Sequence, residues 1–315
     1  MKPDEVLVSE ETGDDAAVYR LPDGGGLVVS IDVFTPIVDD PTDWGRIAAA
    51  NALSDIYAMG ADPRLALNLA GWPVDDVPLA LLADVLRGAR DTAGEAGVAV
   101  VGGHTITTER EPLFGMVAIG FVDPSRVVRN STAQPGMRLV LTKPIGTGLI
   151  ATALKRDVLG SGQLEAAVAT MTTLNAAAAS AMTATQAGAG TDVTGFGLLG
   201  HLRRMLEASG VAAEVDATAV PLLPGVLDLA SRDVVPGGTK RNHAWLRSTT
   251  DWGELTLPEQ LVLADAQTSG GLLIATHQVD ALRTALEARG VMNAEVGRIV
   301  EGPSGRIAVA GRLVA

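Results

Sequence analysis

The apolar segments of this 315-residue chain come in two lengths, and their order limits the fold more than any other feature. Short segments rich in β-branched residues, such as Leu27–Phe34 and Leu113–Val122, predict strands. Longer segments with helical spacing, Trp44–Met59 with Asp43 as its N-cap and Leu79–Ala96, predict helices. Because strands also arrive in neighbouring pairs, we expect an α+β fold with mixed sheets that helices cover on one face.

A polar stretch divides the chain. Asn130–Gly136 combines Ser, Thr, Gln, Pro and Gly, a composition typical of a connection between folded units. The chain is also longer than the ~250–300 residues at which single cores stop growing. We therefore predict two domains, residues 1–133 and 134–315. In the second, Leu164–Ala184 predicts one long helix.

Composition excludes several classes of function. The net charge of −13 and the 3% aromatic content disfavour binding to nucleic acid, because phosphate backbones are repelled and stacking side chains are scarce. The absence of cysteine excludes disulfides and thiolate chemistry in these 315 residues. Met1–Glu11 is too acidic for a signal peptide, and no apolar run approaches the ~18 residues of a membrane span. We expect a cytoplasmic protein with no membrane partner.

Four aspartates stand beside glycine or inside apolar segments: Asp15, Asp32, Asp55 and Asp192. Any one of them could be a helix cap or a paired surface acid. A carboxylate in an apolar segment costs several kcal/mol, of order ~5, unless it is paired or binds a metal. Four such positions together favour a site for divalent cations, and oxygen-only ligands suit Mg²⁺ or Mn²⁺.

Glycine-rich segments near predicted strands and helices are the second signal. Gly102-Gly103-His104 follows the short strand predicted at Val98–Val101, and Gly195-Phe196-Gly197 precedes a predicted helix. Such loops direct backbone N–H groups at phosphate, although each could be a simple tight turn. Thr268–Leu272 is likewise a turn or a ligand-facing loop.

Several longer motifs resemble those of one enzyme family. They are Glu11–Val18 (ETGDDAAV), Asp39–Pro41 with Gly45–Ala49, Asn51–Gly60 (NALSDIYAMG), Gly102–Thr105 (GGHT), Leu141–Gly148 (LTKPIGTG), Thr191–His201 (TDVTGFGLLGH), Pro236–Thr239 with Arg241-Asn242, and Gln267–Leu273 (QTSGGLL). Taken in this order, from about Glu11 to the C-terminus, they resemble selenophosphate synthetase (selenide, water dikinase). The stretches Asn51–Gly60 and Thr191–His201 are long enough to be specific.

The resemblance implies the two-domain α+β fold of the aminoimidazole ribonucleotide synthetase superfamily and a homodimer built through the N-terminal domains. It implies ATP bound with Mg²⁺, and ATP-dependent phosphoryl transfer to selenide that gives selenophosphate, AMP and phosphate. It implies metal ligands at Asp15, Asp55 and Asp192. It implies nucleotide contacts at Thr12, Gly13, Asp14, Asp32, Asp55, Gly103, His104 and Thr105. Lys143 and Arg46 are candidate partners for further phosphate oxygens.

The sequence departs from the family pattern at its start. Family members carry, upstream of the Gly-Asp-Asp motif, a Gly-rich segment with a Cys or selenocysteine and an essential Lys. These 315 residues contain no Cys, and Lys2 has no Gly-rich context, so the catalytic residues stay unknown. On this interpretation the chain binds ATP with Mg²⁺ and forms little selenophosphate. The alternatives are a sister ATP-dependent kinase or synthetase, acting on thiamine monophosphate or a formylglycinamidine, and a non-catalytic ATP-binding subunit.

Overall fold

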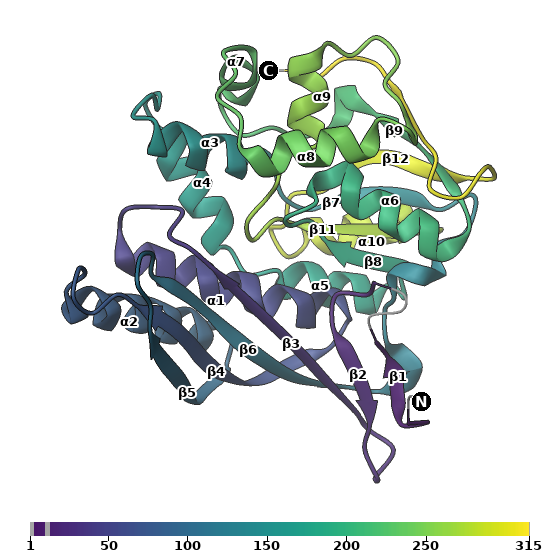
Figure 1. The fold of residues 1–315 in the computed structure, drawn as a ribbon. Helices are drawn as coiled ribbons and strands as arrows, with labels where there is room; N and C mark the ends of the chain where they lie inside the picture. Colours follow the sequence, from purple (N-terminus) through teal and green to yellow (C-terminus); the bar gives the residue numbers. More distant parts are fainter. Residues whose placement is uncertain (1–2, 10–12, 315) are drawn as a thin grey trace.

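A computed structural model describes residues 3–9 and 13–314, which form two mixed β-sheets, one below the other in Figure 1. The first sheet has the order β1-β2-β3-β6-β4-β5 and the second the order β10-β13-β9-β12-β7-β11-β8. The first contains β1 (Val6–Val8), β2 (Ala17–Arg20), β3 (Gly26–Phe34), β4 (Asp62–Trp72), β5 (Ala99–Thr107) and β6 (Leu113–Val122). The second contains β7 (Arg138–Leu141), β8 (Ala189–Asp192), β9 (Ala212–Asp216), β10 (Thr250–Asp251), β11 (Leu272–Thr276), β12 (Ala294–Val300) and β13 (Ile307–Ala310).

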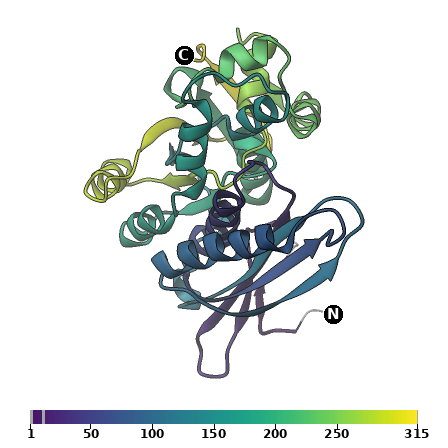
Figure 2. The same cartoon turned by 90° about the vertical axis from the view of Figure 1, so that its left-hand side faces the viewer.

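Helices cover one face of the first sheet and surround the second, which confirms the predicted α+β class. Against the first sheet lie α1 (Pro41–Ala58) and α2 (Leu79–Glu95), seen from the side in Figure 2. The second half holds α3 (Thr147–Lys155), α4 (Gln163–Thr172), α5 (Ala176–Ala184), α6 (Gly197–Ser209), α7 (Val226–Ser231), α8 (Gly237–Leu246), α9 (Leu257–Leu263) and α10 (Val279–Glu287). None of the helices in the described ranges has the length and apolarity that crossing a membrane requires.

Helix α1 is the central element, because it packs on the first sheet and also contacts α4, α5 and β8 of the second half. It begins three residues earlier than the sequence predicted. Its N-cap is Asp40, whose side chain accepts a hydrogen bond from the backbone N of Asp43 at 2.9 Å, so the assignment of Asp43 as the cap was wrong. Close contact with α2 requires glycine, since a Cβ at Gly45 would lie 2.0 Å from the carbonyl oxygen of Val85.

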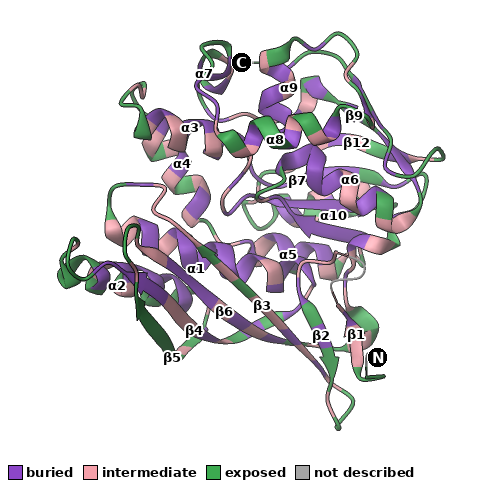
Figure 3. Ribbon diagram, viewed as in Figure 1, coloured by how far each residue is buried: buried purple, intermediate pink, exposed green. Residues whose placement is uncertain are grey.

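The face of the first sheet that points away from α1 and α2 is apolar and partly open to solvent. One row across it joins Ile31 on β3, Val117 on β6 and Leu67 on β4. Ile31 is 57% exposed and Phe121, on the same face, is 42% exposed. Figure 3 shows exposed positions along β3 and β5. Burying such a face would remove a large apolar area from water.

The long helix predicted at Leu164–Ala184 is in fact two helices, α4 and α5. They are separated at Thr173, which has an extended backbone (φ −68°, ψ 123°), and at Asn175. The side-chain amide of Asn175 donates to Ser54 on α1 and to the carbonyl oxygen of Gly270, both at 2.8 Å. A contact between the two halves of the chain therefore coincides with the break.

The prediction of a glycine-rich loop at Gly102–His104 is also wrong, because these residues belong to strand β5, which continues to Thr107. Strand β5 lies at the sheet edge and runs parallel to β4, with Gly103 opposite Asn68. A Cβ at Gly103 would lie 2.3 Å from the carbonyl oxygen of Asn68. The glycine that suggested a loop is instead required by the close approach of two strands.

Candidate metal and nucleotide site

Four aspartates from both halves of the chain converge where α1 meets the second sheet. Asp15 precedes β2, Asp32 lies in β3, Asp55 lies in α1 and Asp192 ends β8. Asp192 acts electrostatically on each of the other three carboxylates, and Asp55 also feels Asp32 and Asp15. We call these four residues the aspartate cluster. The sequence analysis singled out all four aspartates as candidate residues of a cation site. Their convergence, however, depends on how the two halves of the chain pack together.

Asp15 and the loop before it are fixed by contacts with both halves of the chain. Its Oδ1 accepts a hydrogen bond from the hydroxyl of Thr191 at 2.7 Å, which joins it to the strand that ends in Asp192. The preceding loop is fixed by Asn130, whose backbone N donates to Asp14 at 2.8 Å and whose side-chain amide donates to the carbonyl of Gly13 at 2.6 Å. The loop is therefore held by the segment that connects the two halves.

Asp32 and Asp55 are oriented by polar side chains on the facing elements. Asn51 lies one turn before Asp55 on α1, and its amide donates to Oδ2 of Asp32 at 2.9 Å. The hydroxyl of Ser30 on β3 donates to Asp55. Ser30 and Asp32 point to the same face of the strand because side chains alternate. The sheet and the helix thus hold each other's carboxylates.

Asp192 has a different set of partners. It accepts a hydrogen bond from Ser54, the residue before Asp55, and the positive charge of Lys143 acts to lower its pKa. The ammonium of Lys143 is buried and donates to the carbonyl oxygens of Thr173 and Ser269, at 2.6 and 2.9 Å. The Thr268–Leu272 segment therefore packs against this region, through the carbonyl oxygen of Ser269.

The cluster carries more negative charge than its surroundings neutralise. Burial, followed by the charge of Asp192, raises the pKa of Asp32 to about 7 and raises the pKa values of Asp15 and Asp55 well above their usual range. Burial also raises the pKa of Asp192 to about 6, although Ser54 and Lys143 oppose that shift. Burial lowers the pKa of Lys143 to about 7. One buried lysine does not compensate four carboxylates, so the site favours added cations.

The residues present fit a divalent cation. Oδ2 of Asp15 and Oδ2 of Asp192 are both buried and have no hydrogen-bond partner. Buried polar atoms nearly always have one, so two such oxygens in one cluster call for another ligand. Carboxylate oxygens without nitrogen or sulfur ligands suit Mg²⁺ best.

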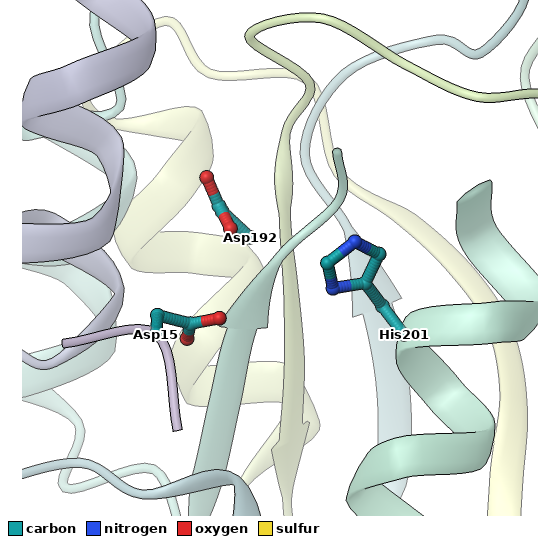
Figure 4. A group of neighbouring side chains, drawn as sticks. All are labelled: Asp15, Asp192 and His201. Carbon is teal, nitrogen blue, oxygen red and sulfur yellow. The ribbon is translucent and has the colours of Figure 1, made fainter. Parts of the chain in front are cut away.

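His201 on α6 was not predicted to be part of this site. One ring nitrogen of His201 and one oxygen each of Asp15 and Asp192 lie within 4.8 Å of one another, around the end of β8 in Figure 4. Nε2 of His201, however, accepts a hydrogen bond from the backbone N of Thr194 at 3.1 Å. Its lone pair is therefore engaged, and burial lowers the pKa of His201 to about 3, so the ring is neutral. His201 holds the loop after Asp192 in place.

Not every residue singled out from the sequence lies at the cluster. Gly103, His104 and Thr105 are on edge strand β5, three strands from Asp32 and so ~14 Å away at about 4.8 Å per strand. Arg46 pairs with Asp43 at 3.1 Å near the start of α1, ~13 Å along the helix from Asp55. Thr12 lies outside the described residues. Asn51 and Ser54 went unnoticed, although polar residues beside Asp55 in an apolar helix were a usable signal.

Comparison with known proteins agrees with this geometry. Residues 13–122 match the family model for the AIR synthase related protein N-terminal domain, and residues 134–310 match that for its C-terminal domain. The chain is 46% identical over 306 residues to a selenide, water dikinase of Carboxydothermus hydrogenoformans, covering 96% of this chain and 88% of that protein. The chain belongs to the selenide, water dikinase family. A family member of Myxococcus xanthus is 48% identical over 310 residues, covering 96% of this chain and 87% of its own length.

Solved structures of lower identity share the fold. A thiamine-monophosphate kinase from Stenotrophomonas maltophilia superposes with a TM-score of 0.73 at 22% identity, covering 99% of this chain and 93% of its own. Hydrogenase maturation protein HypE in complex with ATP gives 0.69 at 21% identity, covering 92% and 83%. These likenesses bear on the architecture of this family member and not on its substrate.

Proposed function

We propose that the chain catalyses ATP-dependent phosphoryl transfer to selenide, forming selenophosphate, AMP and phosphate. The observation that carries the proposal is the aspartate cluster, one buried and three half-buried aspartates drawn from both halves of the chain. The chain is also 46% and 48% identical, over 96% of its length, to two relatives that are named selenide, water dikinase. Phosphoryl transfer depends mainly on positioning and on neutralisation of charge, which such a cluster provides once it holds cations.

Mg²⁺ is the cation we propose, with Asp15, Asp55 and Asp192 as its ligands. The unpartnered Oδ2 atoms of Asp15 and Asp192 support this assignment. When bound, Mg²⁺ would neutralise polyphosphate charge and orient it. A polyphosphate would otherwise be repelled by the four carboxylates, so we expect ATP binding to require the metal.

The remaining residues of the site position the nucleotide in this proposal. Asp32, held by Asn51, would contact ATP from the sheet side, and Gly13 and Asp14 would approach it from the loop before β2. Selenide attacks the γ-phosphorus, the bond from that phosphorus to the bridging oxygen of the β-phosphate breaks, and ADP stays in the site. Water then attacks the β-phosphorus of ADP, giving AMP and phosphate. Lys143 stabilises Asp192 from the buried side.

Gly103, His104 and Thr105 would serve the nucleotide site of a second copy. Within one chain the row from Asp32 to Gly103 runs through Met116, which is fully buried beneath α1. ATP bound at the cluster has no route along that row. The apolar outer face supports a homodimer, since pairing two such faces would bury them and bring each edge strand toward the other chain.

Selenide-dependent product formation tests this function. With ATP, Mg²⁺ and selenide under anaerobic conditions, ³¹P NMR should show selenophosphate, AMP and phosphate in equal amounts, formed slowly because these 315 residues contain no cysteine. Asp192→Asn should abolish all three products, whereas Asp84→Asn on α2, where Asp84 is half-buried and pairs with Arg87, should not. ADP as the final product, or ATP consumption that does not depend on selenide, would instead indicate a sister kinase.

A further inference from the structure

Arg204 on α6 lies against Gly13, in the loop that leads to Asp15, and has no anionic partner among the described residues. It is half-buried, and within residues 3–9 and 13–314 its guanidinium makes no hydrogen bond or ion pair. The neighbouring Arg203 behaves differently, because it pairs with Glu207 at 2.7 Å and donates to the carbonyl of Trp245 at 2.8 Å. In a chain with 37 acidic and 24 basic residues, a half-buried arginine that is unpaired among the described residues needs a specific explanation.

The position of Arg204 is set by an aromatic ring and by the Gly13 loop. Its guanidinium carbon lies 4.1 Å from the centre of the Phe196 ring, at the start of the same helix. Its Nη1 lies 3.4 Å from where a Cβ on Gly13 would be, so the guanidinium lies against the loop that carries Asp15. The same charge acts on His201, which lies beside Asp15 and Asp192.

This arrangement suits a tetrahedral oxyanion. Stacking on Phe196 fixes the plane of the guanidinium and leaves the N–H groups at its edge free to donate. Two parallel N–H groups match two oxygens of a phosphate, and the match is stronger where water is partly excluded. A carboxylate partner from the described part of the chain would have occupied that edge, and none does.

We propose that Arg204 binds a phosphate-type oxyanion beside the aspartate cluster. The inference deepens the proposed function and rests on it for the identity of the ligand: the terminal phosphate of ATP before transfer, or orthophosphate afterwards. Both have the same oxygen geometry, so binding experiments must distinguish them. Arg204 is the residue in this part of α6 that would contact the ligand, and Phe196 positions it.

Calorimetric titration with orthophosphate, and separately with ATP, in the presence of Mg²⁺ tests the proposal. Arg204→Gln should weaken one of these ligands at least tenfold, and Arg204→Lys, which keeps charge but not the planar fork, should fall between that variant and the unaltered chain. Arg203→Gln is the matched control on the same helix and should leave both affinities within twofold. Loss confined to orthophosphate identifies the released product as the ligand, and loss confined to ATP identifies the terminal phosphate.

Unchanged affinity for both ligands in a folded Arg204→Gln variant would overturn the proposal. If that variant does not fold, Arg204→Lys carries the test, and affinities equal to those of the unaltered chain overturn it. The two proposals fail separately. If orthophosphate binding depends on Arg204 but no selenide-dependent AMP forms, the proposed function is wrong and the Arg204 site stands. Conversely, Arg204→Gln could form AMP in a selenide-dependent reaction with the KM for ATP and the inhibition by orthophosphate of the unaltered chain. That result would overturn the Arg204 site and leave the proposed function standing.

Discussion

Asn51 joins Asp32 of the first sheet to the second half of the chain with a single side chain. Its amide donates to Oδ2 of Asp32 at 2.9 Å, while its Oδ1 accepts from the backbone N of Ser269 at 2.8 Å. Both bonds are in the interface where the aspartate cluster forms. The relative placement of the two halves and the orientation of a cluster carboxylate therefore depend on one residue of α1.

Replacing Asn51 tests that dependence. Asn51→Ala leaves the buried N–H of Ser269 without an acceptor, which should lower the free energy of unfolding by about 1–3 kcal/mol. Urea denaturation measures the change. The control Asn293→Ala removes a side chain that bonds Arg283 outside the interface, and it should cost less than about 1 kcal/mol. Equal losses in the two variants would contradict the role assigned to Asn51.

Asp55→Asn separates metal binding from folding, because it should weaken metal-dependent binding without lowering the stability of the folded chain. The substitution removes a charge that Asp192, Asp32 and Asp15 repel, so the metal-free protein should unfold at the same or a higher temperature. Mg²⁺-dependent ATP affinity should nevertheless fall at least tenfold, about 1.4 kcal/mol. Calorimetry measures the affinity, with Asp84→Asn as control. ATP affinity that stays the same in Asp55→Asn would rule out the assigned ligand.

How far the sequence predicts this site differs between its residues. The four aspartates could be recognised because each interrupts an apolar segment or adjoins glycine, and that cost is visible locally. Asn51 and Ser54 are also polar and are buried, but their partners Ser269 and Asp192 come from the other half of the chain. Their roles depend on domain packing, which local patterns do not encode.

The two wrong predictions of secondary structure, at Leu164–Ala184 and at Gly102–His104, also arise from contacts that local sequence does not encode. Leu164–Ala184 has helical composition throughout, yet it is interrupted where Asn175 bonds Ser54 and Gly270. Local propensity favours a continuous helix there, and a tertiary contact overrides it. At Gly103 the composition suggested a loop, whereas β4 and β5 approach so closely that only glycine fits. In both cases the deciding neighbour is distant in the sequence or on another strand.

The apolar outer face predicts the oligomeric state. Light scattering at micromolar concentration should give twice the chain mass of 32.3 kDa. Ile31→Lys places a charge in the centre of that face and should shift the mass to that of one chain. Leu257→Lys is a matched control, because Leu257 is also 57% exposed but lies on α9 of the second half. A single-chain mass for the unaltered protein would contradict the proposed homodimer.

Asp265 provides a pH-dependent prediction away from the aspartate cluster. Its carboxylate is buried at the start of α3, where Oδ2 accepts from the backbone N atoms of Gly148 and Leu149 at 3.1 and 3.2 Å. Oδ1 accepts from the hydroxyl of Thr239 at 2.7 Å. Burial raises the pKa of Asp265 from a usual value of 3.8 to about 7, although these hydrogen bonds act to lower it.

The sign of the effect follows from which state binds the proton. The window runs from about pH 4, near the usual pKa, to about pH 7, near the raised pKa of the folded chain. Within it the folded chain keeps a proton on Asp265 that the unfolded chain has lost. The contribution of Asp265 to the free energy of unfolding therefore falls as pH rises through this window. Asp265→Asn cannot ionise and avoids this loss, so its free energy of unfolding relative to that of the unaltered chain should rise between about pH 5 and about pH 8. Urea midpoints at both pH values measure this difference, and a difference that does not change with pH would show that Asp265 is ionised in the folded protein throughout.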